Sequence, residues 1–330
     1  MPRLPAPLAI ALVALAAAGC ARRTPVFQDS FLAMDSIVEL SIATTTADSA
    51  HAAFAIARRE VERLEAVLSD YRTESNVGRL NARTTDRLEP ETRELLERSQ
   101  ILCRETGGGF DVCMRPIKRL WGFGTSVTPH VPDSVAIAAA LAHTGCDTYA
   151  ITPDGRFAWR DSLAQLDLGG IAQGFVGRCV RDSLRAHGWT NVLVNISGDV
   201  VAGGHRPGGK SWRIGIQHPR QPDSLLTVVN LAASAVTTSG DYEQYFESNG
   251  VRYHHIFDPH TGRPARGLVS VTVFCDDPVL ADCMTKAVFA LGPVDGLAWL
   301  NEREDLRGML VQLGPDRRLQ VTWSDGGPPP

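Results

Sequence analysis

The spacing of apolar residues predicts that helices and strands alternate along this chain. Within residues 47–68, Ala57, Val61, Leu64 and Leu68 recur with the helical period, and charged side chains fill most other positions. A helix is therefore expected there. The same reasoning, with glycine and proline marking the ends, predicts further helices over residues 91–105, 134–143, 171–187, 278–291 and 294–302.

Other stretches have the two-residue period of a strand. Strands are predicted over residues 31–42, 191–196, 212–217, 225–230, 242–257 and 268–274, with two more at the C-terminal end. Asn249-Gly250 lies between two runs that favour strands, which predicts a type I′ hairpin. The elements show no regular βαβ order. We therefore expect an α+β fold: one large domain over residues 31–325, built of interleaved helices and mainly antiparallel strands.

The N-terminal stretch MPRLPAPLAIALVALAAAGC differs from the rest. Its apolar run is too short to span a bilayer and fits the core of a signal peptide. Small residues before Cys20 resemble a bacterial lipobox, so residues 1–19 are predicted to be a lipoprotein signal peptide and Cys20 the lipid-bearing residue. This would anchor the protein in a membrane on the periplasmic side of the cell envelope. The alternative is an ordinary secretory signal with an incidental cysteine. Residues 20–30 would form a tether and 326–330 a disordered tail.

Composition narrows the function. The chain has 330 residues, 44% hydrophobic and 21% charged, which is typical of globular proteins. A formal net charge of −4 without a basic run argues against a nucleic-acid partner. The cysteines after Cys20 are scattered and form no CxxC pair, which argues against a zinc site. They are expected to be mostly buried free thiols, and their spacing cannot assign disulfide partners.

Two short stretches carry candidate chemistry. In YHHIFDPHTG, residues 253–262, strand alternation sends His254 and His255 to opposite faces, so only one of them can face a site. In LDLGGIAQGF, residues 166–175, a glycine-rich turn opens a helix, where a backbone can approach an anionic ligand. This spacing is not that of a dinucleotide-binding Rossmann turn. Ser239 lacks the GxSxG context of a hydrolase nucleophile.

Seven stretches in order resemble the FAD:protein FMN transferase family, the ApbE flavin transferases. They are LSDYRTESNVGRLN, GGFDVCMRPI, LDLGGIAQGFVG, LVNISGDV, TTSGDYEQYF, HHIFDPHTGRP and ADCMTKAVFALG. The resemblance implies an enzyme that binds FAD, cleaves its pyrophosphate with a divalent metal such as Mg²⁺, and joins FMN through its phosphate to a threonine or serine of an acceptor flavoprotein. AMP leaves. The alternatives are a non-catalytic FAD-binding lipoprotein and an FAD pyrophosphatase.

The resemblance also implies roles for individual residues. His255 matches the suspected catalytic base, Asp282 a metal ligand, and the carbonyl of Gly170 a second metal ligand. The positions that match cofactor-binding residues are Met34, Tyr71, Gly109, Phe110, Asp111, Asp167, Gln173 and Ile256.

Two of the matched positions depart from the family. Gln173 stands where lysine is common, and Lys286 stands where the family has a metal-ligating threonine. Because residues four apart share a helix face, Lys286 is expected beside Asp282. Two hypotheses follow. Either a metal still binds through Asp282, the Gly170 carbonyl and phosphate oxygens while Lys286 touches phosphate, or Lys286 takes over the charge of the metal and activity is weak, metal-independent or absent.

Overall fold

An eight-stranded antiparallel sheet runs through the computed structural model, which describes residues 24–328. In spatial order its strands are β1 (Val26–Ala33), β2 (Ser36–Ala43), β5 (Val192–Ile196), β6 (Asp199–Gly203), β9 (Ala235–Gly240), β14 (Ser270–Cys275), β15 (Arg307–Leu313) and β16 (Leu319–Trp323). Every neighbouring pair is antiparallel, and helices separate many of the strands along the chain. The predicted α+β class is confirmed.

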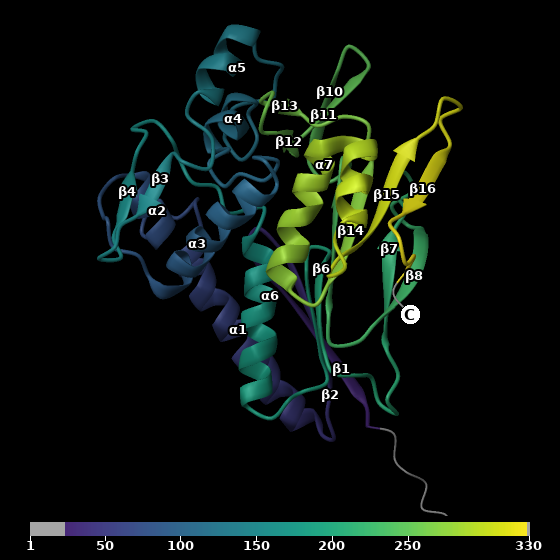
Figure 1. The fold of residues 1–330 in the computed structure, drawn as a ribbon. Coiled ribbons are helices and arrows are strands. Elements are labelled where there is room, and N and C mark those ends of the chain that lie inside the picture. Colours follow the sequence, from purple (N-terminus) through teal and green to yellow (C-terminus); the bar gives the residue numbers. More distant parts are fainter. Residues whose placement is uncertain (1–23, 329–330) are drawn as a thin grey trace, which may run out of the picture.

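Three helices cover one face of the sheet: α1 (Ala47–Leu68), α6 (Ala172–Ala186) and α7 (Pro278–Asn301) (Figure 1). The apolar stripe predicted for α1 is buried, and α1 packs against α6 and against β1 of the sheet. The side chain of Thr46 caps this helix by accepting from the N–H of Ser49. Within α7, Gly292 has a non-helical φ of 79° and precedes Pro293, so α7 consists of two helices that meet at this residue, as predicted.

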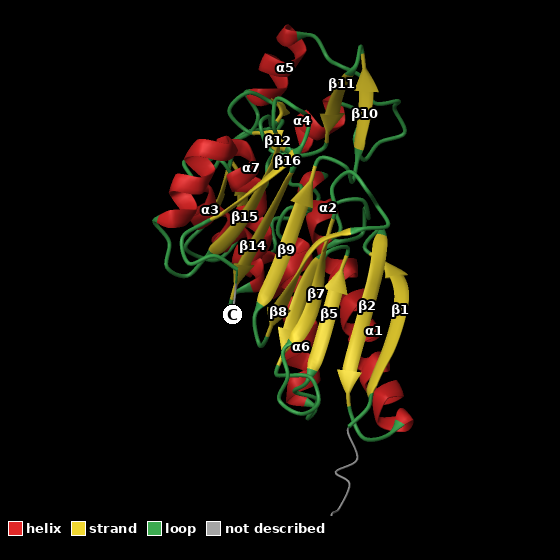
Figure 2. Cartoon of the chain, turned by 90° about the vertical axis from the view of Figure 1, so that its right-hand side faces the viewer, coloured by secondary structure: helices red, strands yellow, loops and turns green. Residues whose placement is uncertain are grey.

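The opposite face is partly covered by a hairpin of β7 (Trp212–Gln217) and β8 (Leu225–Leu231) (Figure 2). Along β7 buried and exposed residues alternate, as the pattern predicts for a half-buried strand. Its buried side chains Trp212, Ile214 and Ile216 pack in one apolar cluster with Val200 and Val236 of the sheet. The sheet therefore lies between a layer of helices and a smaller layer made by this hairpin.

The remaining elements include α2 (Asn76–Asn81), α3 (Pro90–Glu105), α4 (Arg115–Leu120), α5 (Ser134–Leu141), β3 (Tyr149–Ile151), β4 (Phe157–Trp159), β10 (Tyr245–Ser248), β11 (Val251–His254), β12 (Phe257–Asp258) and β13 (Arg263–Pro264). Helices α4 and α5 and strands β10–β13 gather at one end of the molecule (Figure 1). Trp121 fixes this assembly, because its indole N–H donates to the Gly262 carbonyl at 2.9 Å. The β10–β11 hairpin turns at Asn249 and Gly250 with positive φ values, as predicted.

Several predictions about local structure are wrong. The strand expected over 31–42 is the β1–β2 hairpin, which turns at Met34 and Asp35 with φ values of 54° and 53°. Strand β1 begins at Val26, so the second half of the predicted tether belongs to the sheet. The predicted signal peptide, Cys20 and the last residues of the predicted tail lie outside the described residues.

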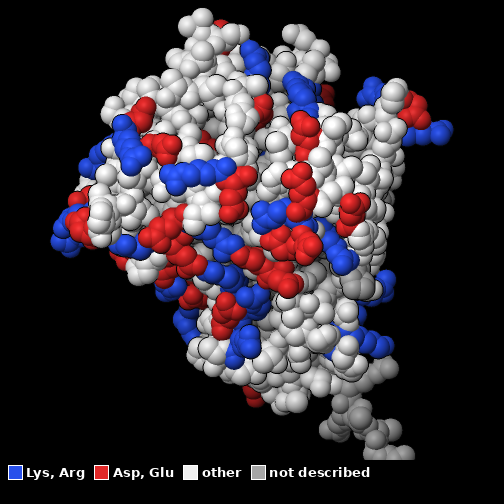
Figure 3. All heavy atoms as spheres, in the orientation of Figure 1, with Lys and Arg blue, Asp and Glu red and all other residues white. Residues whose placement is uncertain are grey.

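The helical side of the surface carries closely mixed charges (Figure 3). Acidic and basic side chains pair across it within and between helices; Arg63 of α1, for example, is 2.9 Å from Glu60 of the same helix and 2.5 Å from Glu91. Such exposed pairs contribute little to stability individually. Within residues 24–328, no helix is both long enough and apolar enough to cross a bilayer.

One disulfide joins Cys103 of α3 to Cys146, and Cys113, Cys179, Cys275 and Cys283 are free. Most of these cysteines are thus free thiols, as predicted, but one pair is not. The bond links positions 43 residues apart, which on the chain-entropy model stabilises the fold by about 4 kcal/mol. Replacing both cysteines by serine should lower the free energy of unfolding by roughly that amount in denaturant titrations. Replacement of the partly buried free Cys179 by serine is the control, and an equal loss there would contradict the prediction.

Candidate active site

Most of the predicted site residues meet in one cavity at the end of the sheet. It is lined by Gly109, Phe110, Asp111, Asp167, Gly170, His255 and Ile256, together with Lys118 and Lys286. Met34, Tyr71 and Gln173 line a second cavity, which shares Gly169 with the first. Asp282 is fully buried beside them, in contact with Lys286. Residues separated by more than two hundred positions in the chain are therefore brought together.

The two adjacent histidines have different surroundings. The His254 ring is buried, where its Nε2–H donates to the Ala265 carbonyl at 2.9 Å and its Nδ1 accepts from the Ile256 N–H at 3.3 Å. His255 instead lines the cavity. Its Nδ1 lies 3.2 Å from the Gln244 carbonyl, which can only accept, so Nδ1 carries the hydrogen. The lone pair of Nε2 is then available as a proton acceptor.

Both rings are neutral at physiological pH. Burial lowers the pKa of His255 to about 3, and the ammonium groups of Lys118 and Lys286 act in the same direction. Burial also lowers the pKa of His254 to about 4. A neutral imidazole with a free Nε2 can take a proton from a hydroxyl group without first losing one of its own. The free Nε2 and the position in the cavity make His255 the candidate proton acceptor, while its lowered pKa makes it a weaker base than a free imidazole; His254 is a support.

His254 should make stability depend on pH. Its pKa falls from 6.5 in the unfolded chain to about 4 in the fold, so only the unfolded state takes up this proton between those values. Stability is lost as the pH falls through that window, by at most about 1.4 kcal/mol per pH unit for this group. In His254→Gln the unfolding free energy, measured by urea titration at several pH values, should fall less steeply with acidification. Equal slopes in the two proteins would count against this account.

A second set of charges lines the cavity wall. The Lys118 ammonium lies 2.7 Å from one oxygen of Asp167, and the other oxygen accepts from the Gly169 N–H at 2.9 Å. Burial alone would raise the pKa of Asp167, but Lys118, the Gly169 N–H and the charge of Arg115 together outweigh it, and the pKa is lowered. Tyr71 lies against this pair, with its ring centroid 6.0 Å from the Lys118 nitrogen. Arg115 pairs with Asp70 at the same wall.

The third group of charges surrounds Asp282. One of its oxygens accepts from the Gly174 N–H at 2.9 Å, and the other is paired with the Lys286 ammonium one turn along α7. Asp199 of β6 is also buried, and burial followed by the charge of Asp282 raises its pKa well above the usual range. The pairing expected from the spacing of Asp282 and Lys286 is therefore present in the fold.

The glycine-rich stretch at the start of α6 lies at the cavity and also packs against α7. A Cβ on Gly174 would lie 2.2 Å from the Pro278 carbonyl oxygen, so this glycine permits α6 to pack against α7. Gly169 and Gly170 line the cavity, and a Cβ on Gly170 would lie 3.3 Å from the Phe110 ring and 3.7 Å from the Lys286 stem. The approach of this backbone to an anionic ligand stays a prediction.

Comparisons with known proteins agree with this arrangement. A profile of the ApbE family matches residues 34–310. The chain belongs to the ApbE family. An FAD:protein FMN transferase of Vibrio cholerae is 34% identical over 247 residues, covering 73% of each chain. One from Treponema pallidum is 32% identical over 295 residues, covering 82% of this chain and 80% of the other.

Solved structures of ApbE proteins have the same fold. The apo form of the flavinyl transferase ApbE from Pseudomonas stutzeri superposes with a TM-score of 0.81 at 31% identity, covering 92% of this chain and 96% of that one. The ApbE protein of Thermotoga maritima superposes with a TM-score of 0.83 at 29% identity, covering 91% and 97%. These similarities establish the family and its fold.

Sequence reasoning missed several charged side chains at this ApbE-family site. Arg115 is part of the GGFDVCMRPI stretch and Lys118 directly follows it; both lie on α4, where a cluster of basic residues was the available signal. Asp199 lies in the LVNISGDV stretch at the start of β6, and nothing in its local sequence indicates that it is buried beside Asp282. Ser239, which was weighed as a nucleophile, lies 2.7 Å from the Thr285 hydroxyl in the interior between β9 and α7.

Proposed function

We propose that this protein transfers FMN from FAD to a threonine or serine of an acceptor flavoprotein and releases AMP. The observation that carries the proposal is the neutral His255 facing the same cavity as the ammonium groups of Lys118 and Lys286. A base beside concentrated positive charge suits attack of a hydroxyl group on a diphosphate. The relatives named as FAD:protein FMN transferases support this choice of substrate.

The reaction can be written with this chain's own groups. The acceptor hydroxyl oxygen attacks the FMN phosphorus, and its proton passes to Nε2 of His255. The bond from that phosphorus to the bridging oxygen breaks, and AMP leaves with this oxygen. Lys118 and Lys286 neutralise the phosphate oxygens, because charge neutralisation and positioning supply most of the catalysis in phosphoryl transfer.

The residues around Asp282 do not fit a divalent cation. Both carboxylate oxygens already accept from protein donors, and one donor is the Lys286 ammonium, which would repel a metal ion. Within the described residues no group of three or more histidine, cysteine, aspartate or glutamate side chains could hold a metal. We propose that Lys286 supplies the positive charge that a magnesium ion would supply, and no step of the reaction is assigned to a metal.

The transferase is tested by incubating the protein with FAD and a flavin-free acceptor domain that carries a threonine target. Fluorescent acceptor bands in a denaturing gel and an equal amount of AMP are expected. The threonine-to-valine form of the acceptor is the control and should stay dark. AMP without labelled acceptor would instead identify an FAD pyrophosphatase. Bound FAD with neither product would identify a flavin-storing protein.

We also propose that Cys20 carries a lipid that anchors the protein on the periplasmic side of the envelope. The Cys103–Cys146 disulfide supports an oxidising compartment, since such bonds are rare in the cytosol. Radiolabelled palmitate should be incorporated into the full-length protein and not into Cys20→Ser. Labelling of both forms would overturn the assignment of Cys20.

A further inference from the structure

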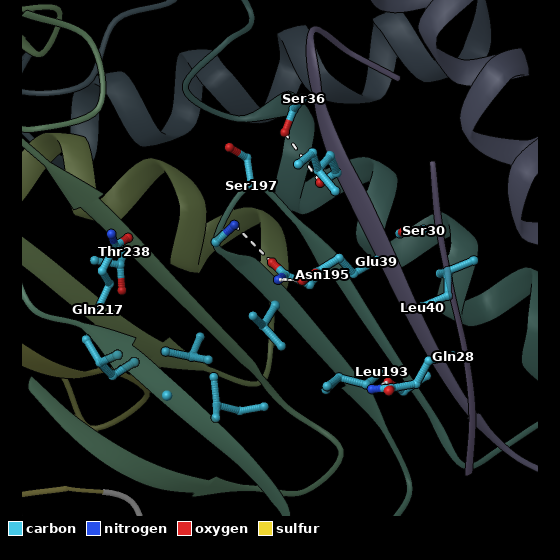
Figure 4. Close-up of a pocket in the computed structure, with 18 of the residues that line it drawn as sticks. Gln28, Ser30, Ser36, Glu39, Leu40, Leu193, Asn195, Ser197, Gln217 and Thr238 are labelled. Carbon is cyan, nitrogen blue, oxygen red and sulfur yellow. Dashed lines mark hydrogen bonds between the residues drawn. The ribbon is translucent and has the colours of Figure 1, made fainter. Parts of the chain in front are cut away.

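A groove lies on the face of the sheet that the helices do not cover, outside the cavities described above (Figure 4). Its floor is formed by side chains of β1, β2, β5 and β9, and one wall is β7. Ser36 and Ser197 lie at one end, and Gln28 and Leu193 lie toward the other (Figure 4). The β7–β8 hairpin covers only part of this face, which leaves the groove open between the hairpin and β1.

The wall of the groove is the edge of a strand. Five consecutive residues, 213–217, line it, and no residue of β8 does. The groove therefore runs along the side of β7 that faces away from β8. In the described part of the chain β7 pairs with β8 alone, so this edge has no backbone partner. An unpaired edge is a template for another strand.

Several polar side chains on the floor of the groove are already hydrogen-bonded within the protein. Asn195 donates to Glu39 at 2.7 Å, and Gln28 donates to Ser41 at 3.2 Å. Thr238 is likewise satisfied by the Thr272 hydroxyl. In the described residues the side of β7 away from β8 has free backbone groups that a ligand in the groove could bind. This favours an extended peptide, which can pair through its own backbone.

At one end of the groove, three separate segments lead within one or two residues to residues of the active site. Ser36 lies in the groove two residues after Met34, which lines the second cavity described above. Ser197 and Gly198 line the groove directly before Asp199. Tyr242 and Glu243 line it directly before Gln244, whose carbonyl holds His255. A chain lying in the groove would thus leave it beside the proposed reaction centre.

We infer that this groove binds an extended segment of the acceptor protein as an added strand on the edge of β7, with the target hydroxyl beyond the Ser36 end. Five paired residues would span roughly 17 Å. The inference rests on the proposed function, because it assigns the groove to that reaction's second substrate. It explains how a protein target, rather than water, is presented to His255.

Hydrogen–deuterium exchange tests the inference directly. With saturating flavin-free acceptor domain, amides of residues 213–217 that are free in the unbound protein should exchange about tenfold more slowly. Strand β16 is the matched control, because it is also an edge strand, at the end of the eight-stranded sheet. Its amides should not change, and FAD alone should change neither strand. Absence of protection on β7 would overturn the inference.

The two proposals fail separately. Labelled acceptor without protection of β7 would support the transferase activity and contradict acceptor binding in the groove. Protection of β7 without labelled acceptor would support acceptor binding in the groove and contradict the transferase activity. Asn195→Trp, which narrows the groove, should raise the KM for the acceptor about tenfold while FAD affinity stays the same. Gln320→Trp on exposed β16 is its control, and an equal effect of both variants would contradict the assignment.

Discussion

Replacing His255 by asparagine should lower the rate of FMN transfer by about 10²- to 10⁴-fold while FAD binding persists. The imidazole is the one group in the cavity that the fold keeps neutral with a free nitrogen, because Nδ1–H is engaged by the Gln244 carbonyl. Asparagine can replace the Nδ1–H donor but provides no basic nitrogen. Single-turnover labelling of the acceptor measures the chemical step, and flavin fluorescence measures binding.

The matched control is His260→Asn, which removes an exposed histidine from the turn that follows β12. This variant should transfer FMN like the wild type. The pH dependence gives a second check. Since the pKa of His255 is lowered to about 3, its protonation should not reduce kcat/KM for FAD between about pH 5 and pH 8. A His255→Asn protein that keeps full transfer activity would contradict the assigned role.

Regular elements of this fold could be predicted where local pattern and local chemistry agree. Helix α1 has an apolar stripe, an N-terminal cap at Thr46 and no glycine, and its predicted limits coincide with the observed ones. The Asn249-Gly250 hairpin likewise follows from two residues that tolerate positive φ. The β1–β2 turn was missed because Met34 and Asp35 adopt positive φ without glycine or proline to mark it.

The active site was predictable only in part for a related reason. The Asp282–Lys286 pair follows from spacing on one helix, which a sequence displays directly. The donor on the other side of Asp282 is Gly174, 108 positions away, and only the packing of α6 on α7 brings it there. Asp199 and Lys118 reach the same region from a strand and a short helix. Long-range packing, which no local pattern encodes, decides these contacts.

The wild-type protein should need no divalent metal, and Lys286→Thr should create that need. In the wild type, chelation with EDTA should leave both FAD affinity and transfer unchanged, because the Lys286 ammonium already neutralises Asp282 and lines the cavity proposed to hold the phosphates. Removing it deletes a charged hydrogen bond worth roughly 1.5–3 kcal/mol, so FAD should bind about 10- to 100-fold more weakly in EDTA. Added Mg²⁺ should restore much of this loss.

A measurement of metal binding distinguishes a new metal site in Lys286→Thr from a mere loss of packing around the substituted side chain. Lys286→Thr leaves Asp282 buried without a counter-charge and adds a hydroxyl oxygen four residues away, a pair suited to a hard cation. Mn²⁺ should therefore bind to this variant, as seen by electron paramagnetic resonance, and not to the wild type. Lys286→Arg keeps the charge and should remain independent of metal, and exposed Lys210→Thr should behave like the wild type. Tight Mn²⁺ binding by the wild type, with transfer lost in EDTA, would mean that Lys286 turns aside for a metal after all.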